Sequence, residues 1–301
     1  MDGVCLRFMH TLLEDLLSNG PVITDGAWGT QLQARGLALG EFPDLWNLTH
    51  PERVEQVAGA YVEAGSRIIL TNTFGANRIR LTEHGAADQV LDINHRGAEI
   101  SLKAANGRAR VFASMGPTGK LLLSGDVTAE EMRAAFFEQA QALARGGADA
   151  LVVETMSDLE EAKLAVSAAR ETGLPVVASM VFDSGKNKDR TMMGNTPEQA
   201  ARALCAAGAN VIGANCGQGI AGFVNICERL RSATDCPIWI KANAGLPTVV
   251  EGCAQYNTTP KEFASFVPAL LKAGASFLGG CCGTGPEFIA AMKQCVTSLQ
   301  P

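Results

Sequence analysis

The chain alternates short β-favouring apolar runs with stretches whose apolar residues recur at helical spacing, and it does so eight times. Strands of a parallel sheet covered by helices on both faces read as such near-continuous apolar runs. The expected strands are Val22–Asp25, Arg67–Thr71, Arg110–Met115, Ala150–Thr155, Val176–Val181, Asn210–Asn215, Ile238–Asn243 and Ser276–Gly280.

Eight strand–helix units in 301 residues predict an α/β fold, a single (β/α)8 TIM barrel. A doubly wound open sheet is the alternative. The count of eight favours the barrel, and so does the lack of a Gly-rich dinucleotide fingerprint after the first strand. We expect one domain over residues 1–301, in which residues 1–20 form an extra N-terminal helix before the first strand that closes the bottom of the barrel.

The ends of the expected helices carry residues that are typical of helix caps. Thr128 and Thr196 are each followed three residues later by Glu or Gln, which is the pattern of a capping box at a helix start. Gly65, Gly208 and Gly274 follow apolar helical stretches, where a glycine in the left-handed conformation ends a helix.

Composition excludes several classes of protein. The net charge is −6 and no basic stripe is visible, so a nucleic-acid partner is not expected. No stretch approaches the roughly 20 apolar residues that span a membrane, so no membrane partner is expected either. Nine cysteines, an odd number spread over a long chain, favour a reducing compartment, and we predict a cytoplasmic protein.

Polar residues gather where the expected strands end, and barrel enzymes place their sites at that rim. The first strand runs into Asp25-Gly26-Ala27-Trp28, and the second into Thr71-Asn72-Thr73-Phe74. The other strand ends contribute Glu154, Asn215-Cys216, Asn243 and Cys281-Cys282.

The three rim cysteines are the sharpest of these signals. Neighbouring side chains in a strand point to opposite faces, so Cys281 and Cys282 can share a target only if the backbone turns sharply. The glycines at 279, 280, 283 and 285 supply freedom for such a turn. With Cys216 they would form a soft, sulfur-rich site suited to zinc, whereas each cysteine alone is more often a small hydrophobe.

The remaining rim residues also have plainer interpretations. Asp25 and Glu154 would serve equally well to cap backbone amides or to pair with a basic residue. Trp28 and Phe74 would fit equally well in the core or in the wall of a pocket. The four histidines form no metal-ligand spacing. We interpret six cysteines as packing or incidental residues: Cys5, Cys205, Cys227, Cys236, Cys253 and Cys295.

The motifs together resemble the homocysteine S-methyltransferase family, in order and spacing, from about residue 20 to the end. The residues that carry the resemblance are Asp25–Thr30, Thr71–Phe74, Gly213–Cys216 and Gly279–Thr284. Within the family, Asn243–Pro247 is most similar to the methionine synthase branch.

The resemblance implies a zinc enzyme that methylates homocysteine to methionine. Cys216, Cys281 and Cys282 would be the zinc ligands and, with Glu154, the catalytic residues. Asp25 and Glu154 would hold the ammonium group of homocysteine. Backbone amides near Gly26, Ala27 and Thr73 would receive its carboxylate, Phe74 would contact substrate, and Asn243 would contribute to the fourth zinc position when substrate is absent.

The methyl donor is left open by the sequence. No Asp-x-His-x-x-Gly cobalamin-ligand motif is present. The donor would be a small compound such as S-methylmethionine, whose cation Trp28 and Phe74 would meet through cation–π attraction, or a separate methyl-corrinoid protein. The other interpretations are a zinc-binding accessory barrel and a methyltransferase for a different thiol.

Overall fold

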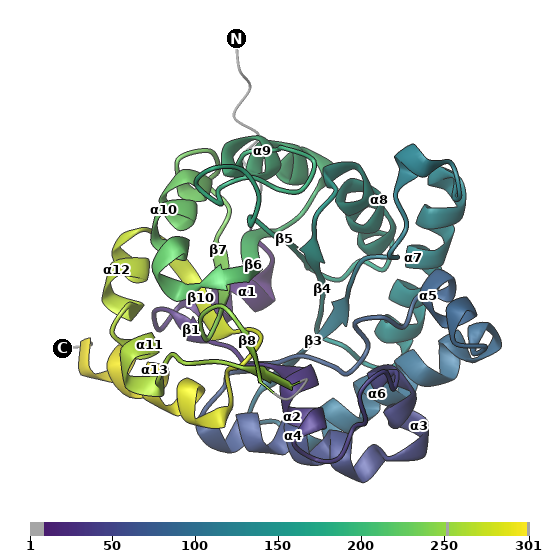
Figure 1. Ribbon diagram of the computed structural model, residues 1–301, viewed down its shortest axis with the longest axis horizontal. Coiled ribbons are helices and arrows are strands. Elements are labelled where there is room, and N and C mark those ends of the chain that lie inside the picture. The colour runs from purple at the N-terminus through teal and green to yellow at the C-terminus, as the bar shows by residue number, and fades with distance from the viewer. Residues whose placement is uncertain (1–8, 251–252, 300–301) are drawn as a thin grey trace.

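The computed structural model describes residues 9–250 and 253–299, and eight parallel strands form its centre. Figure 1 shows the strands inside a ring of helices. The order around the sheet is β1-β10-β7-β6-β5-β4-β3-β2. The strands are β1 (Val22–Ile23), β2 (Ile68–Ile69), β3 (Arg110–Met115), β4 (Ala150–Met156), β5 (Val176–Met180), β6 (Val211–Gly219), β7 (Ile238–Asn243) and β10 (Ala275–Gly280). The predicted (β/α)8 barrel is confirmed.

The seam between β1 and β2 explains why these two strands are shorter than predicted. One backbone hydrogen bond crosses it, from Arg67 N to Ile23 O at 2.8 Å. Further along, Leu70 N donates to the Asp25 carboxylate (Oδ2, 2.7 Å) instead of a backbone carbonyl. A side chain therefore replaces the ladder at the point where the first strand reaches the rim.

Helices surround the barrel, with the predicted capping boxes at Thr128 and Thr196 both formed. The helices are α1 (Thr11–Leu17), α2 (Trp28–Gln33), α3 (Trp46–Thr49), α4 (Pro51–Ala64), α5 (Arg78–Glu83), α6 (Val90–Ala105), α7 (Ala129–Arg145), α8 (Leu159–Arg170), α9 (Pro197–Ala207), α10 (Ile220–Arg231), α11 (Pro260–Ala264), α12 (Val267–Lys272) and α13 (Pro286–Leu299), with short 3-10 turns at Pro43–Leu45, Ala87–Gln89 and Leu122–Ser124. Among the described residues, no helix is long and apolar enough to cross a membrane.

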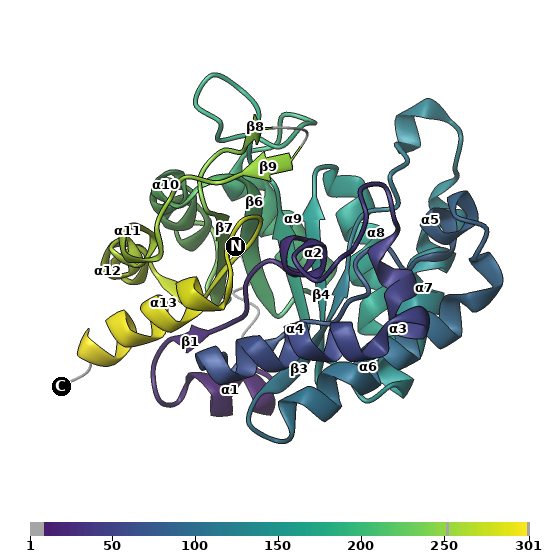
Figure 2. The same ribbon diagram turned by 60° about the horizontal axis from the view of Figure 1, so that its bottom comes forward.

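The lower interior of the barrel is an apolar layer capped by α1. Leu13 and Leu16 of α1 belong to one buried cluster with inward-facing residues from all eight strands, including Phe112, Trp239 and Phe277. Figure 2 shows α1 below the strands. The extra N-terminal helix thus covers the lower end of the barrel. It runs from Thr11 to Leu17, which is shorter than the predicted residues 1–20, and residues 1–8 of that range lie outside the described residues.

A short antiparallel hairpin that the sequence analysis did not predict lies at the opposite end (Figure 2). It pairs β8 (Thr248–Val250) with β9 (Cys253–Gln255). The chain therefore makes an excursion between β7 and the helices α11 and α12, on the side of the barrel where the strands end.

Candidate metal and substrate site

The three rim cysteines meet at one point above the barrel. The sulfurs of Cys216, Cys281 and Cys282 all lie within 4.8 Å of one another, and those of Cys216 and Cys282 are 3.9 Å apart. Three thiolates on one tetrahedral zinc, each about 2.3 Å from the metal, would be about 3.8 Å apart. The described residues contain one such metal-ligating group, and its donors and spacing fit zinc.

Unusual backbone at the end of β6 turns Cys216 toward its partners. Cys216 has φ +61° and Gly217 has φ +78°, and the pairing with β7 is irregular between Asn215 and Gly219. A non-glycine residue rarely adopts this left-handed conformation, and such positions concentrate at functional sites.

At the end of β10 the glycines matter mainly because they lack a side chain, and less because of their backbone freedom. Of the four glycines in this segment, Gly283 alone has positive φ, at +80°. A Cβ on Gly279 would lie 2.0 Å from Thr24 Oγ1, and one on Gly280 would lie 2.1 Å from Thr284 Oγ1. The expectation that all four supply special conformations is therefore wrong, because two of them are needed for close packing.

The thiols polarise one another. Hydrogen bonds from Cys281 and Cys282 lower the pKa of Cys216 to about 3, and the same contact with Cys216 raises the pKa of Cys281 and of Cys282. The cluster thus readily holds one negative charge but resists a second and a third. A bound cation would be required for all three to ionise, since like charges this close oppose one another.

Two asparagines hold the thiols from behind. Asn215 accepts hydrogen bonds from Ser179 Oγ (2.7 Å) and Thr155 N (2.9 Å), and its Nδ2 lies 4.0 Å from Cys281 Sγ. The Asn243 side chain lies close to the Cys216 thiol and helps to lower the pKa of that thiol. The buried Asn243 Oδ1 has no hydrogen-bond partner among the described residues, so an acceptor atom is left unsatisfied beside the sulfurs.

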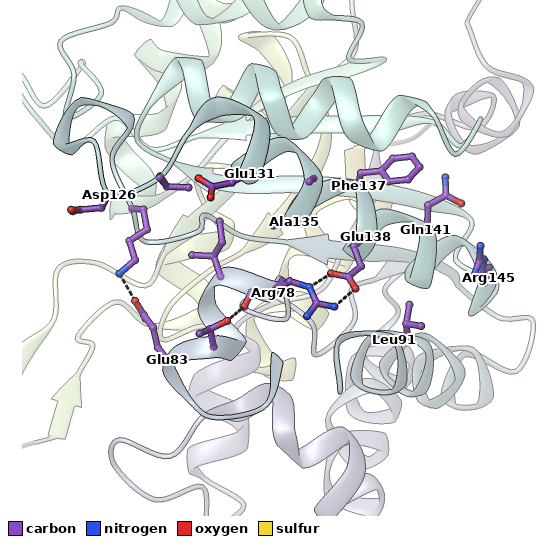
Figure 3. Close-up of a pocket in the computed structure, with 15 residues that line it drawn as sticks. Arg78, Glu83, Leu91, Asp126, Glu131, Ala135, Phe137, Glu138, Gln141 and Arg145 are labelled. Carbon is purple, nitrogen blue, oxygen red and sulfur yellow. Dashed lines mark hydrogen bonds and ion pairs between the residues drawn. The ribbon is translucent and has the colours of Figure 1, made fainter. Parts of the chain in front are cut away.

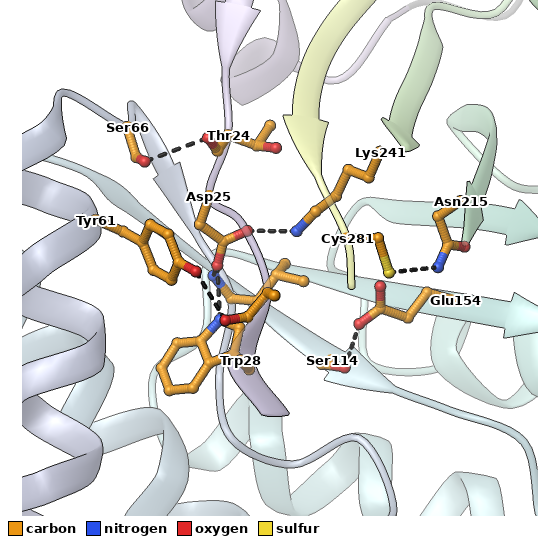
Figure 4. Close-up of polar contacts among 12 residues, drawn as sticks. Thr24, Asp25, Trp28, Tyr61, Ser66, Ser114, Glu154, Asn215, Lys241 and Cys281 are labelled. Carbon is orange, nitrogen blue, oxygen red and sulfur yellow. Dashed lines mark hydrogen bonds and ion pairs between the residues drawn. The ribbon is translucent and has the colours of Figure 1, made fainter. Parts of the chain in front are cut away.

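Asp25 is fully buried and engaged on both carboxylate oxygens (Figure 4). Oδ2 accepts from Trp28 Nε1 and from Leu70 N, each at 2.7 Å. Oδ1 pairs with the ammonium of Lys241. Burial would lower the pKa of Lys241, but the charges of Asp25 and Glu154 outweigh burial and raise it.

Lys241 is a site residue that the sequence analysis missed. It lies in the middle of β7, within Ile238-Trp239-Ile240-Lys241-Ala242-Asn243. A lysine inside a strand buried on both faces is rare unless it is paired, and that was the available signal.

Glu154 is buried near the end of β4 and accepts a hydrogen bond from Ser114 Oγ on Oε1 (2.5 Å). Its other oxygen has no hydrogen-bond partner within the part of the chain that the structure describes. Burial raises the pKa of Glu154, while Lys241 and the Ser114 hydrogen bond act in the opposite direction.

These groups surround a cavity of about 480 Å³ that opens at the rim. Of the predicted site residues, those that line it are Gly26, Ala27, Trp28, Phe74, Glu154, Cys216, Cys281 and Cys282, together with the unpredicted Lys241. Asp25, Thr73 and Asn243 lie behind this lining. The Ala27 amide donates to Thr284 O at 2.9 Å, and Thr73 Oγ1 to Ser114 O at 2.7 Å.

Four other cysteines whose side chains the structure describes lie away from this cluster. Cys205 and Cys236 have their sulfurs 3.1 Å apart. Cys227 is buried, which raises its pKa to about 12, and Cys295 is half-buried on α13. Cys5 and the side chain of Cys253 lie outside the described residues.

A larger hollow, of about 820 Å³, lies on the outside of the barrel between α5 and α7 (Figure 3). Ion pairs of Arg78 with Glu138 and of Lys120 with Glu83 cross it, and no cysteine lines it. Because it lies apart from the thiols and the buried charges, the smaller cavity is the candidate site.

Known proteins match most of the length of this chain. Residues 22–296 match the family model described as "Homocysteine S-methyltransferase". The chain is 33% identical to methionine synthase of Mycobacterium tuberculosis and 32% identical to that of Mycobacterium leprae, over 96% and 97% of its own length. It spans about a quarter (26%) of the length of each of these relatives.

The fold also matches solved structures. The homocysteine methyltransferase MmuM from Escherichia coli superposes in its metallated form with a TM-score of 0.78, at 23% identity, covering 94% of this chain and 99% of that one. Its oxidized form gives 0.77 at the same identity and coverage. At this identity the likeness establishes the barrel and no more.

Proposed function

This chain belongs to the homocysteine S-methyltransferase family, and we propose that it transfers a methyl group from an activated donor to the thiol of homocysteine. The product would be methionine. The observation that carries the proposal is the meeting of Cys216, Cys281 and Cys282 at the wall of a charged cavity.

We propose that the three cysteines hold zinc, since their spacing and sulfur donors fit that ion. Zinc bound there would remove the proton of the acceptor thiol at neutral pH, because coordination deprotonates a thiol outright. Asn243, whose Oδ1 has no hydrogen-bond partner among the described residues, would complete the ligand set when no substrate is bound. A reducing compartment such as the cytoplasm would keep the thiols available.

The acceptor would lie in the cavity with its sulfur toward the cysteines. The unpartnered oxygen of Glu154 is available for its ammonium group, and a charge-assisted hydrogen bond to a carboxylate is among the stronger polar contacts. The methyl donor would enter from the rim, where Trp28, Phe42 and Phe74 line the cavity. Attack by sulfur on the methyl carbon breaks the donor's bond to that carbon, and the electron pair leaves with the donor.

A small sulfonium donor such as S-methylmethionine suits this aromatic rim, because aromatic faces attract a desolvated cation. A separate methyl-corrinoid protein is the alternative donor. The test is a donor screen with zinc-loaded protein and homocysteine, comparing S-methylmethionine, S-adenosylmethionine, betaine, methyltetrahydrofolate and methylcobalamin, the last both free and protein-bound. Methionine formation with one donor supports the proposal and names the donor. No methionine with any of them, from protein that binds zinc, would favour an accessory barrel.

A second acceptor must be offered in the same screen. Cysteine has one methylene group fewer than homocysteine. It carries the same charged groups, but they lie closer to its own thiol. A rate with cysteine equal to that with homocysteine would assign the barrel to a different thiol.

A further inference from the structure

Lys241 points into the interior of the barrel, where its neighbours leave room for its side chain. Trp239, Lys241 and Asn243 alternate along β7, and Trp239 belongs to the apolar layer inside the barrel, so Lys241 points inward one layer above it. In register, Lys241 lies between Asn215 of β6 and Gly279 of β10. A Cβ on Gly279 would come within 3.2 Å of the Lys241 side chain, so the glycine leaves room for the lysine.

The Lys241 ammonium group has hydrogen-bond donors without an acceptor among the described residues. Its side chain is 3% exposed, and among the described residues its one hydrogen-bond acceptor is Asp25 Oδ1. An ammonium group has three donors, so two of them have no acceptor in the part of the chain that the structure describes. Lys241 lines the cavity. Buried donors left unpaired are costly, which points to an anionic oxygen of a ligand.

Asp25 is poorly placed to serve a ligand. Its two oxygens are engaged by Lys241, Trp28 and Leu70, and it lies behind the cavity lining. Its contacts close the β1–β2 seam and fix the lysine. Asp25 is therefore a positioning residue in this arrangement.

Glu154 supplies the opposite charge in the same cavity. Figure 4 shows Asp25 on one side of Lys241 and Glu154 on the other. Glu154 has one oxygen free of described partners, as Lys241 has two free donors. A cation and an anion of this kind, beside three thiols, are complementary to a zwitterionic amino acid that carries a thiol.

We infer that Lys241 binds the α-carboxylate of the acceptor, with Glu154 on its ammonium group and Asp25 holding Lys241 in place. This rests on the proposed function. It differs from the sequence expectation, in which Asp25 shares the ammonium group and backbone amides take the carboxylate. One of those amides, the N–H of Ala27, already donates a hydrogen bond to the carbonyl oxygen of Thr284.

The test measures binding, which needs no knowledge of the donor. Zinc-loaded protein is titrated by calorimetry with homocysteine, with its decarboxylated analogue and with its deaminated analogue. Removing one charge-assisted hydrogen bond from a ligand weakens its binding roughly 10- to 100-fold. Wild type should therefore bind both analogues more weakly than homocysteine. In Lys241→Met, the penalty for lacking the carboxylate should vanish, while the penalty for lacking the ammonium group should remain.

Two further variants separate recognition from folding. Lys241→Met leaves Asp25 buried without its partner, so the double variant Asp25→Asn with Lys241→Met removes that charge and should show the same absence of carboxylate discrimination in a stable protein. The matched control is Asp25→Asn alone, which keeps the lysine and should still prefer the ligand with a carboxylate.

Three results would overturn the inference. Full carboxylate discrimination in the double variant would place the carboxylate elsewhere. Equal binding of homocysteine and its deaminated analogue to wild type would mean that Lys241 fills the position of the acceptor's ammonium group. Failure of wild type to bind homocysteine at all would remove the proposed function, and this inference with it.

Discussion

The lower and upper halves of the barrel interior use the same strands for opposite purposes. Below, Phe112, Trp239 and Phe277 form a layer of aromatic rings, with neighbouring centroids 6.2 and 5.5 Å apart. Two residues further along the same strands stand Ser114, Lys241 and Gly279. Because side chains alternate, a step of two keeps the inward direction while changing the chemistry.

The lower layer of the barrel interior serves the stability of the fold, and the upper layer serves the candidate site. The lower layer gains free energy from apolar burial and from close packing of rings. The upper layer buries charges and unsatisfied polar atoms, such as those of Lys241, Glu154 and Asn243, which oppose folding unless they are paired. Substitutions in the two layers should therefore change different measurements.

The largest effect is expected from Cys281→Ala in the upper half. Removing one of three sulfur ligands should reduce zinc content to background and abolish methyl transfer, since structural and catalytic sites need their full donor set. Elemental analysis of reduced protein measures the first and a methylation assay the second. Cys295→Ala, on α13 away from the cluster, is the matched control. A variant at position 281 that keeps stoichiometric zinc and full rate would contradict the assignment.

Phe112→Ala changes the lower layer, so it should reduce stability without removing the zinc site. Removing a fully buried ring costs about 3–5 kcal/mol of unfolding free energy through reduced burial and the cavity left behind. The midpoint of urea unfolding should fall, while folded protein still binds zinc through the three cysteines. Loss of zinc without loss of stability would break the separation between the layers.

The pH dependence of stability should reveal the cost of buried carboxylates near the rim. Burial raises the pKa of Asp44, which lines the cavity, from 3.8 to about 7. A folded-state pKa above the unfolded value favours the native state fully at low pH, and this contribution is lost as pH rises through about 4 to 7. Its full size is no more than about 4 kcal/mol.

Asp44→Asn should therefore raise the unfolding midpoint at pH 8 and leave it nearly unchanged at pH 4. The measurement is urea unfolding of metal-free protein at both pH values. The amide oxygen can still accept the hydrogen bond that Gly75 N gives to Asp44 Oδ1. Equal shifts at the two pH values would mean that ionisation of Asp44 is not the cause.

The smallest effect is expected from Glu154→Gln, and it should appear in binding. The substitution removes a charge from the upper layer while keeping an acceptor for Ser114 Oγ. Homocysteine binding should weaken by about 1.5–3 kcal/mol, which is the value of a hydrogen bond to a charged group. Calorimetry on zinc-loaded protein measures this. An unchanged affinity would remove Glu154 from the proposed ammonium contact.

Much of the fold was predictable because it depends on local patterns. The ranges predicted for β3 and β7 agree with the structure, and those for β4, β5 and β10 agree to within one residue. The strands β1, β2 and β6 differ because side chains and irregular pairing replace the regular ladder there. The β8–β9 hairpin carried no turn signal strong enough to be recognised.

The candidate site divides in the same way. Cys216, Cys281 and Cys282 were identifiable because a thiol at a strand end is chemically distinctive and the barrel brings all strand ends to one rim. Lys241 was missed, and Asp25 and Glu154 could not be told apart. Which of two buried carboxylates meets a lysine depends on contacts between strands distant in sequence.

By itself, the sequence determined the (β/α)8 architecture, the helix caps and the rim that carries the three sulfurs, because periodicity, capping and strand direction act over a few neighbouring residues. Only the tertiary structure decided that Asp25 is paired and turned away from the cavity while Lys241 and Glu154 keep unpaired atoms facing it. The physical reason is that hydrogen-bond satisfaction is a property of the packed interior, where residues more than 200 positions apart become partners.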